Sequence, residues 1–158
     1  MNNKSTIALT GATGHLGSNL LHYLLEEGHQ IKALYRDKVV PHHHKNLTWV
    51  KGDVNNVDAL SQLIENASVI IHCASIISLG DVKKELVHEV NVKGTETLVQ
   101  LCEKTQIRFI YISSSTVAED SINDEEFDEK RPYKSDQKFY YAWTKILSEK
   151  IIACKRII

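Results

Sequence analysis

The chain has 158 residues, 42% of them hydrophobic and 25% charged, a composition that fits one globular domain spanning residues 1–158. Its 19 basic and 20 acidic side chains nearly cancel, so charge gives no reason to expect nucleic acid or an anionic membrane as a partner. The apolar run after Ser5 is too short for a signal peptide or a membrane span, and a cytoplasmic protein is therefore expected.

Strand and helix signals alternate along the chain, which predicts a parallel α/β architecture with right-handed crossovers. Strands are expected at residues 6–9, 30–36, 47–51, 68–74 and 107–113. Helices are expected from about Gly14, around residues 57–64, over roughly 82–104 and around Tyr141. The first helix should bury one stripe formed by Leu16, Leu20, Leu21, Leu24 and Leu25.

A glycine-rich turn, Thr10-Gly11-Ala12-Thr13-Gly14-His15-Leu16-Gly17, joins the first strand to the first helix. The free N–H groups and the positive dipole end of that helix favour a phosphate. Gly11, Gly14 and Gly17 would serve the tight turn, the close approach of the phosphate and the packing of helix on strand. Any β–α turn can use glycine, so the assignment depends on the surrounding elements.

The end of the second strand bears on the cofactor, since the residue about 20 positions after the glycines meets the adenosine ribose. An acid there favours NAD, whereas Arg36 offers a guanidinium that could clasp a 2′-phosphate. NADP is therefore favoured, and the neighbouring Asp37 leaves NAD possible. A solvated turn is the plain alternative. Asp53, after the third strand, could serve as the N-cap of the next helix.

Tyr141 and Lys145 are four residues apart on a predicted helix, which places both side chains on one face. A phenol with a pKa of roughly 10 is a poor acid–base catalyst at neutral pH, but a neighbouring ammonium favours its ionised form. An amphipathic helix with an exposed lysine is the alternative. Before this helix, the fifth strand ends in Ser113-Ser114-Ser115, at the sheet edge where ligands bind in doubly wound folds.

These motifs, in this order, resemble the extended short-chain dehydrogenase/reductase superfamily, which includes the NAD-dependent epimerase/dehydratase family. The segments His72-Cys73-Ala74-Ser75 and Asn91-Val92-Lys93-Gly94-Thr95 are also similar to it. The resemblance implies a Rossmann fold, a doubly wound parallel sheet with five strands in the order 3-2-1-4-5. It implies cofactor contacts from Gly11, Thr13, Gly14, His15, Leu16, Gly17, Arg36, Asp53, Ala74, Tyr141 and Lys145, with Asp53 against the adenine.

The resemblance further implies hydride transfer between the nicotinamide C4 and the carbonyl carbon of a small-molecule ketone or secondary alcohol. Ser114 would hydrogen-bond the carbonyl oxygen, with Ser113 and Ser115 as alternatives. Tyr141 would give or remove the proton, while Lys145 lowers the Tyr pKa and holds the nicotinamide ribose. Asn91 stays outside the catalytic set, because its side chain could simply break and rebond a helical turn.

Dihydroflavonol-4-reductase-like, NADP-dependent ketone reductases are the nearest likeness, and nucleotide-sugar epimerases or dehydratases are the alternative. Superfamily members run considerably further than Ile158, so a truncated chain without the C-terminal substrate domain is implied. A non-catalytic NAD(P)-binding module or an inactive fragment is the third reading. The fifth strand would then form an apolar sheet edge, which predicts a homo-oligomer or poor solubility.

Other features favour structural interpretations. Cys73, Cys102 and Cys154 match neither a disulfide framework nor a zinc ligand set, and are expected to be reduced and buried. The histidines at 42–44 stand on a loop without a cysteine or acid at ligand spacing, so no metal is expected. The seven acids within 119–129 lack the central glycine of a calcium loop, so a solvated loop over the active-site mouth is expected.

Overall fold

The computed structural model describes residues 5–36, 43–77, 82–120, 128, 130–135 and 139–155. Its centre is a parallel five-stranded sheet in the order β3-β2-β1-β4-β5, which confirms the predicted topology. The strands are β1 (Thr6–Thr10), β2 (Gln30–Tyr35), β3 (Leu47–Lys51), β4 (Val69–His72) and β5 (Arg108–Tyr111). Leu9 pairs with Ala33 on one side and with Ile71 on the other, so β1 lies at the middle of the sheet.

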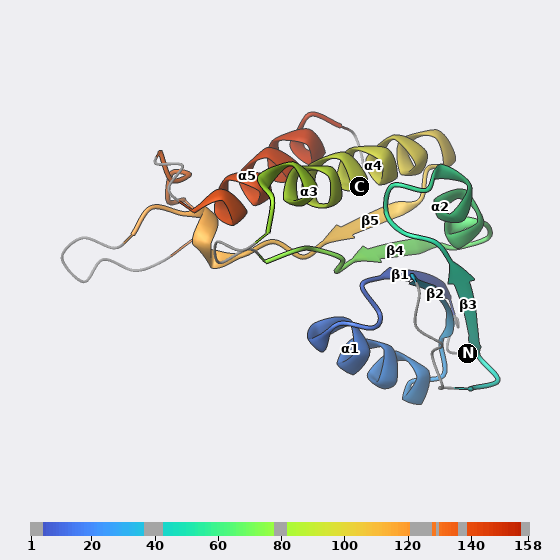
Figure 1. The fold of residues 1–158 in the computed structure, drawn as a ribbon. Helices are drawn as coiled ribbons and strands as arrows, with labels where there is room; N and C mark the ends of the chain where they lie inside the picture. Colours follow the sequence, from blue (N-terminus) through green and yellow to red (C-terminus); the bar gives the residue numbers. More distant parts are fainter. Residues whose placement is uncertain are drawn as a thin grey trace.

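Helices cover both faces of this sheet (Figure 1). The helices are α1 (His15–Glu26), α2 (Val57–Ile64), α3 (Lys84–His88), α4 (Gly94–Thr105) and α5 (Tyr140–Ala153), with a π-helical turn η1 (Glu89–Lys93) and a 3-10 turn η2 (Ser115–Val117). Alternate residues of β1 enter different cores: Ile7 and Leu9 pack with α1, and Ala8 packs with α2 and α4. The fold is therefore doubly wound, as predicted.

The stripe predicted for the first helix holds except at its first member. Leu21, Leu24 and Leu25 are buried, and Leu20 packs against the same core. Leu16 is 51% exposed, so its predicted burial was wrong. It lies in the first turn of α1, beyond the carboxyl end of β1, where the sheet no longer covers the helix.

The long helix predicted over 82–104 is three consecutive elements, because α3 passes into the π turn η1 before α4 begins. Hydrophobic periodicity cannot detect a turn widened by one residue. Strands β2, β4 and β5 are also shorter than predicted, since pairing stops before the residues that line the sheet edge. All three cysteines are free, but Cys73 is half-buried and Cys154 exposed, which corrects the prediction that all are buried.

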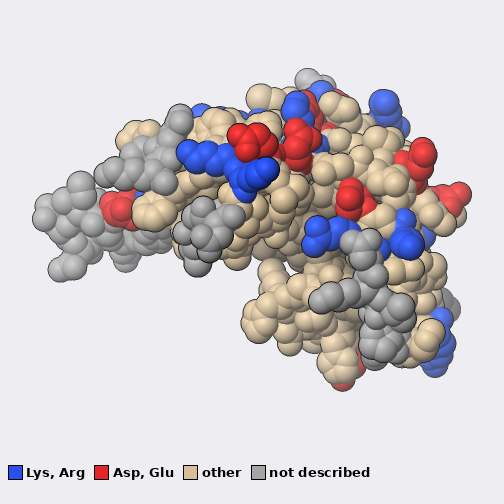
Figure 2. Space-filling view, in the orientation of Figure 1, with Lys and Arg blue, Asp and Glu red and all other residues tan. Residues whose placement is uncertain are grey.

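The molecular surface carries no large field of one charge on the face seen in Figure 2, where basic and acidic side chains are interspersed over the helices. This matches the net charge of −1. Strand β5 ends the sheet order, so its outer edge has no partner strand in the described part of the chain, and Ile110 is 39% exposed there. No helix among the described residues is long and apolar enough to cross a membrane.

Candidate functional site

At the glycine turn, the chain at Gly11 lies so close to Ala74 and to Gly17 that no side chain would fit between them. Gly11 has a φ of 70°, and a Cβ there would lie 2.6 Å from the Ala74 nitrogen. A Cβ on Gly17 would overlap the Gly11 carbonyl. Gly14 is the N-cap of α1, with no side-chain capping bond and no acid in the first turn. The amides at the start of α1 are therefore left for an anion.

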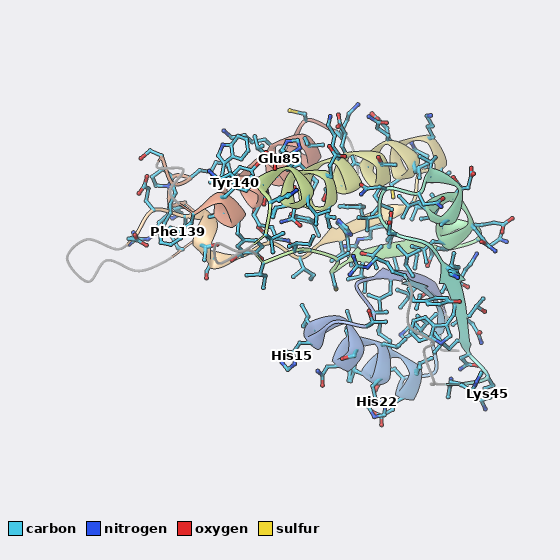
Figure 3. All side chains as sticks on the ribbon, in the orientation of Figure 1. His15, His22, Lys45, Glu85, Phe139 and Tyr140 are labelled. Carbon is cyan, nitrogen blue, oxygen red and sulfur yellow. The ribbon has the colours of Figure 1, made fainter. Side chains whose placement is uncertain are left out.

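A cleft of about 260 Å³ opens beside this turn, at the carboxyl edge of the sheet. It brings together six of the predicted cofactor residues: Gly11, Thr13, Gly14, Arg36, Asp53 and Ala74. Other predicted contacts do not line it, namely His15, Leu16, Gly17, Tyr141 and Lys145. His15 stands at the exposed start of α1 (Figure 3).

Arg36 and Asp53 approach the cleft from the ends of neighbouring strands. Arg36 follows β2, is exposed and lines the cleft, whereas Asp37 lies outside the described residues. Asp53 follows β3, and its carboxylate accepts from the Asn55 amide at 2.8 Å. The N-cap of α2 is Asn56, whose side chain accepts from the Ala59 amide at 2.9 Å. The capping alternative for Asp53 was therefore wrong, and Asp53 lines the cleft.

A buried chain of hydrogen bonds supports the cleft wall at Ala74. The Ala74 amide donates to Thr10 Oγ1 (3.2 Å), and Thr10 contacts His72 Nδ1 (2.6 Å). His72 Nε2 contacts Thr95 Oγ1 (3.0 Å), which itself donates to the Asn91 carbonyl (2.7 Å). Because Thr95 donates onward, it must accept from His72, so the proton sits on Nε2 and Nδ1 accepts. Burial, assisted by the charge of Lys145, lowers the pKa of His72 to about 3 and keeps the ring neutral.

Asn91 links the cleft to α5. It lies buried in η1, and its Oδ1 accepts from the Ile76 amide (2.8 Å) and the Ser75 hydroxyl (3.2 Å). Its Nδ2 donates to the Ile76 carbonyl (3.0 Å) and to Thr144 Oγ1 (3.1 Å). The side chain therefore rebonds a loop and a second helix rather than its own turn, a role that spacing alone could not reveal.

Lys145 is buried, with only 3% of its surface exposed. Its Nζ donates to the Ile112 carbonyl at 2.8 Å and lies 4.6 Å from the centre of the Tyr111 ring. Burial lowers the pKa of Lys145 to about 8, although the charges of Cys73 and Glu149 act in the opposite direction. The alternative of an exposed lysine on an amphipathic helix was therefore wrong.

The three predicted catalytic side chains come from neighbouring segments. Lys145 Nζ lies 5.9 Å from the centre of the Tyr141 ring, so these two residues share one face of α5. Ser114, two residues beyond Ile112, caps η2 and contacts Thr116 Oγ1 at 2.8 Å. Of its neighbours, Ser113 donates to Glu149 and Ser115 is exposed. Ser113 therefore has its proton engaged, whereas in the Ser114–Thr116 contact either hydroxyl can donate.

Several lining residues were not singled out from the sequence: Leu34, Tyr35, Gly52, Val54, Asn55, Cys73, Ser75, Ile76, Leu86 and Val90. Their shared signal was position, since most lie at or just beyond the carboxyl end of a predicted strand. Within the described ranges, no group of three or more metal-binding side chains comes together. His42 and most of the acidic 119–129 segment lie outside those ranges.

The model of the NAD dependent epimerase/dehydratase family matches residues 7–154. A 3-beta-hydroxysteroid dehydrogenase of Mycolicibacterium neoaurum is 31% identical over 92% of this chain and 42% of its own. A Synechocystis protein provisionally named a dihydroflavonol 4-reductase is 38% identical over 67% of this chain and 32% of its own. The chain spans about two fifths of the length of the first curated relatives.

Solved structures share the fold. The Bordetella bronchiseptica enzyme WbmH, in complex with NAD+, superposes with a TM-score of 0.85 at 21% identity, over 98% of this chain and 54% of that one. The dTDP-glucose 4,6-dehydratase of Bacillus anthracis, in complex with NAD, gives 0.77 at 25% identity, over 93% and 49%.

Proposed function

The chain belongs to the NAD dependent epimerase/dehydratase family. We propose that it binds NADP or NAD as the cofactor-binding part of an oxidoreductase that acts on a ketone or secondary alcohol. The observation that carries this proposal is the cleft at the sheet edge, where the glycine turn, Arg36, Asp53 and Ala74 converge. The turn fits a dinucleotide, because Gly14 leaves the first amides of α1 without a side-chain cap and the first turn of α1 carries no acid.

Each residue of the cleft has a distinct binding role in this proposal. Amides at the start of α1 would hold the pyrophosphate. Asp53 would accept from the adenine or its ribose, and the Arg36 guanidinium would bind a 2′-phosphate, which favours NADP. The NAD complexes of the related folds keep NAD as the alternative cofactor.

The bound cofactor would supply or accept a hydride at the nicotinamide C4. Ser114 would donate a hydrogen bond to the substrate oxygen, and Tyr141 would transfer the proton to or from that oxygen. Lys145 would hold the ribose hydroxyls and stabilise the ionised phenol, since its ammonium lies on the same face of α5 as the Tyr141 ring. Its carbonyl partner at Ile112 keeps this buried amine in place.

The 3-beta-hydroxysteroid dehydrogenase among the relatives favours a secondary alcohol as the substrate class. The dTDP-glucose 4,6-dehydratase among the solved structures favours a nucleotide sugar, the second candidate. A non-catalytic cofactor-binding module is the third candidate. These three differ in the reaction, because a ketone reductase consumes NADPH, an epimerase or dehydratase returns its cofactor unchanged, and a module does neither.

The test has two parts. Binding of NADPH and NADH is first measured by the change in nicotinamide fluorescence. Loss of NADPH absorbance is then followed in single-turnover reactions with a panel of aryl ketones, ketosteroids and 4-ketohexose nucleotides. The Tyr141→Phe variant should lower any rate by about 10²–10⁴-fold while leaving cofactor affinity nearly intact, because only the proton donor is removed. An unchanged rate, with the fold preserved by circular dichroism, would assign the chemistry to another group.

A further inference from the structure

A carboxylate outside the predicted catalytic set lies on the same stripe of α5 as Tyr141 and Lys145. Glu149 follows Lys145 by four residues, as Lys145 follows Tyr141. This spacing stacks all three side chains on one helical face, toward the sheet edge. Glu149 is half-buried, unlike the solvated acids that a surface helix normally carries.

The first contact of Glu149 holds the chain just before Ser114. The Ser113 hydroxyl donates to Glu149 Oε1. One residue earlier, the Ile112 carbonyl accepts from Lys145 at 2.8 Å. Two consecutive residues at the end of β5 are therefore attached to two consecutive turns of α5.

The second contact holds the chain after Ser114, through an intermediate segment. The Glu149 carboxylate interacts with the Tyr133 side chain and is the main reason that the pKa of Tyr133 is raised, and Lys150 Nζ of the same helix lies 5.7 Å from the centre of the Tyr133 ring. Tyr133 forms an antiparallel bridge with Ala118, just beyond η2. Lys134 donates its amide to the Val117 carbonyl at 2.8 Å in the same bridge. One carboxylate thus supports the segment on both sides of Ser114.

We propose that Glu149 is a positioning residue of this site, whose carboxylate anchors both ends of the Ser113–Ala118 segment and so fixes Ser114 beside Tyr141 and Lys145. The proposal rests on the proposed function for its kinetic consequence, but the anchoring itself does not depend on activity. Hydrogen bonds to a charged acceptor are stronger and more directional than neutral ones, which suits a group that must hold a loop in one place.

Amide hydrogen exchange tests the anchoring directly. In Glu149→Ala, the amides of Val117, Ala118 and Lys134 should exchange at least about 10-fold faster than in the unaltered chain, because local opening is easier without the anchor. Amides of α1 should be unaffected. Ser113→Ala removes only the first contact and should have a smaller effect. Glu149→Gln keeps an acceptor oxygen and should restore part of the protection.

A matched control is available on the neighbouring helix. Glu103 of α4 pairs with Lys155 at 3.0 Å, and both side chains are partly exposed. Glu103→Ala should leave the exchange at 117–118 and 134 unchanged. If Glu149→Ala fails to fold, Ser113→Ala carries the test. Exchange in Glu149→Ala, or in Ser113→Ala where the first does not fold, equal to that of the control would overturn the proposal.

The kinetic arm separates positioning from a merely structural role. Glu149→Ala should lower kcat by about 10- to 100-fold while the cofactor dissociation constant stays unchanged, since only the serine is misplaced. Glu149→Gln should recover part of kcat. Equal effects on kcat and on cofactor binding would overturn the positioning role. If the unaltered chain reduces none of the carbonyl compounds, the proposed function fails, and amide exchange alone decides the anchoring.

Discussion

Replacing Lys145 with methionine should reveal what a buried charge costs this fold. The pKa of Lys145 falls from 10.5 to about 8, mainly through burial. At about 1.4 kcal/mol for each pH unit, this difference corresponds to a cost of about 3 kcal/mol for keeping the ammonium charged in the folded chain. Lys145→Met removes that cost but leaves the Ile112 carbonyl without its donor, which offsets about 1–3 kcal/mol.

The pH dependence isolates the charge from the lost hydrogen bond. Between pH 8 and 10.5, the unfolded chain binds a proton at residue 145 that the folded chain releases. The unaltered chain therefore gains stability as pH rises through this window, whereas Lys145→Met lacks that gain. Cys102 and Tyr111, whose pKa values are raised, titrate in both proteins and cancel in the difference. The Cys73 titration would not cancel, because the charge of Lys145 lowers the pKa of this thiol, so both proteins are compared with Cys73→Ala.

The assay is urea unfolding of both proteins under reducing conditions at several pH values from 7 to 10.5. The advantage of Lys145→Met should shrink by about 3 kcal/mol across that range, an upper figure because solvent relaxation screens the charge. The same variant should bind cofactor more weakly if Lys145 holds the ribose. A stability difference that is independent of pH would refute the argument, since Lys145 would then titrate alike in the folded and unfolded chains.

Arg36→Ala should weaken NADPH binding by about 1.5–3 kcal/mol and NADH binding little, as measured by fluorescence titration; equal losses would remove the 2′-phosphate assignment. Tyr111→Phe should leave the melting temperature unchanged or raise it, because the Tyr111 hydroxyl lies buried near Ser148 and Thr95 but, in the described part of the chain, makes no hydrogen bond of good geometry. A clear loss of stability would mean that this hydroxyl has a partner in solution. Ile110→Lys should reduce self-association in light scattering across a concentration series, because Ile110 is exposed on the apolar edge strand β5. If the unaltered chain stays monomeric at high concentration, another part of the protein covers this edge.

The fold could be predicted because its signals are local and repeated. Apolar runs bounded by glycine or polar turns indicated the five strands, and the alternation of strands and helices indicated a parallel sheet. The strand order itself was predicted from the resemblance to a known superfamily. Element ends were less predictable, since they depend on where pairing stops. The π turn at Glu89–Lys93 was not predicted, and its Asn91 side chain bonds a loop 15 residues earlier, a contact that local periodicity does not reveal.

Some residues of the candidate site could also be placed from the sequence, and others could not. Residues adjacent to a strand end, such as Arg36 and Asp53, reach the cleft from the strand that precedes them, so sequence alone could place them. Glu149 could not be found in this way, because its partners Ser113 and Tyr133 lie 36 and 16 residues before it and meet it only after α5 packs. Leu16 was predicted to be buried and is exposed, because its helical spacing was right but no sheet covers its turn.

Among the described residues, the buried polar side chains are concentrated in one layer, between the carboxyl half of the sheet and the helices α4 and α5. They are Thr10, His72, Asn91, Thr95, Thr144, Lys145 and Ser148. Ser148 donates to the Asn91 carbonyl at 2.8 Å, which joins α5 to the chain that begins at the Ala74 amide. An apolar contact between the same helices would tolerate sliding, because hydrophobic packing has no direction. Satisfied hydrogen bonds permit one arrangement, so this layer fixes α5 against the cleft and thereby fixes the distance between the cleft wall at Ala74 and the Tyr141–Lys145 pair.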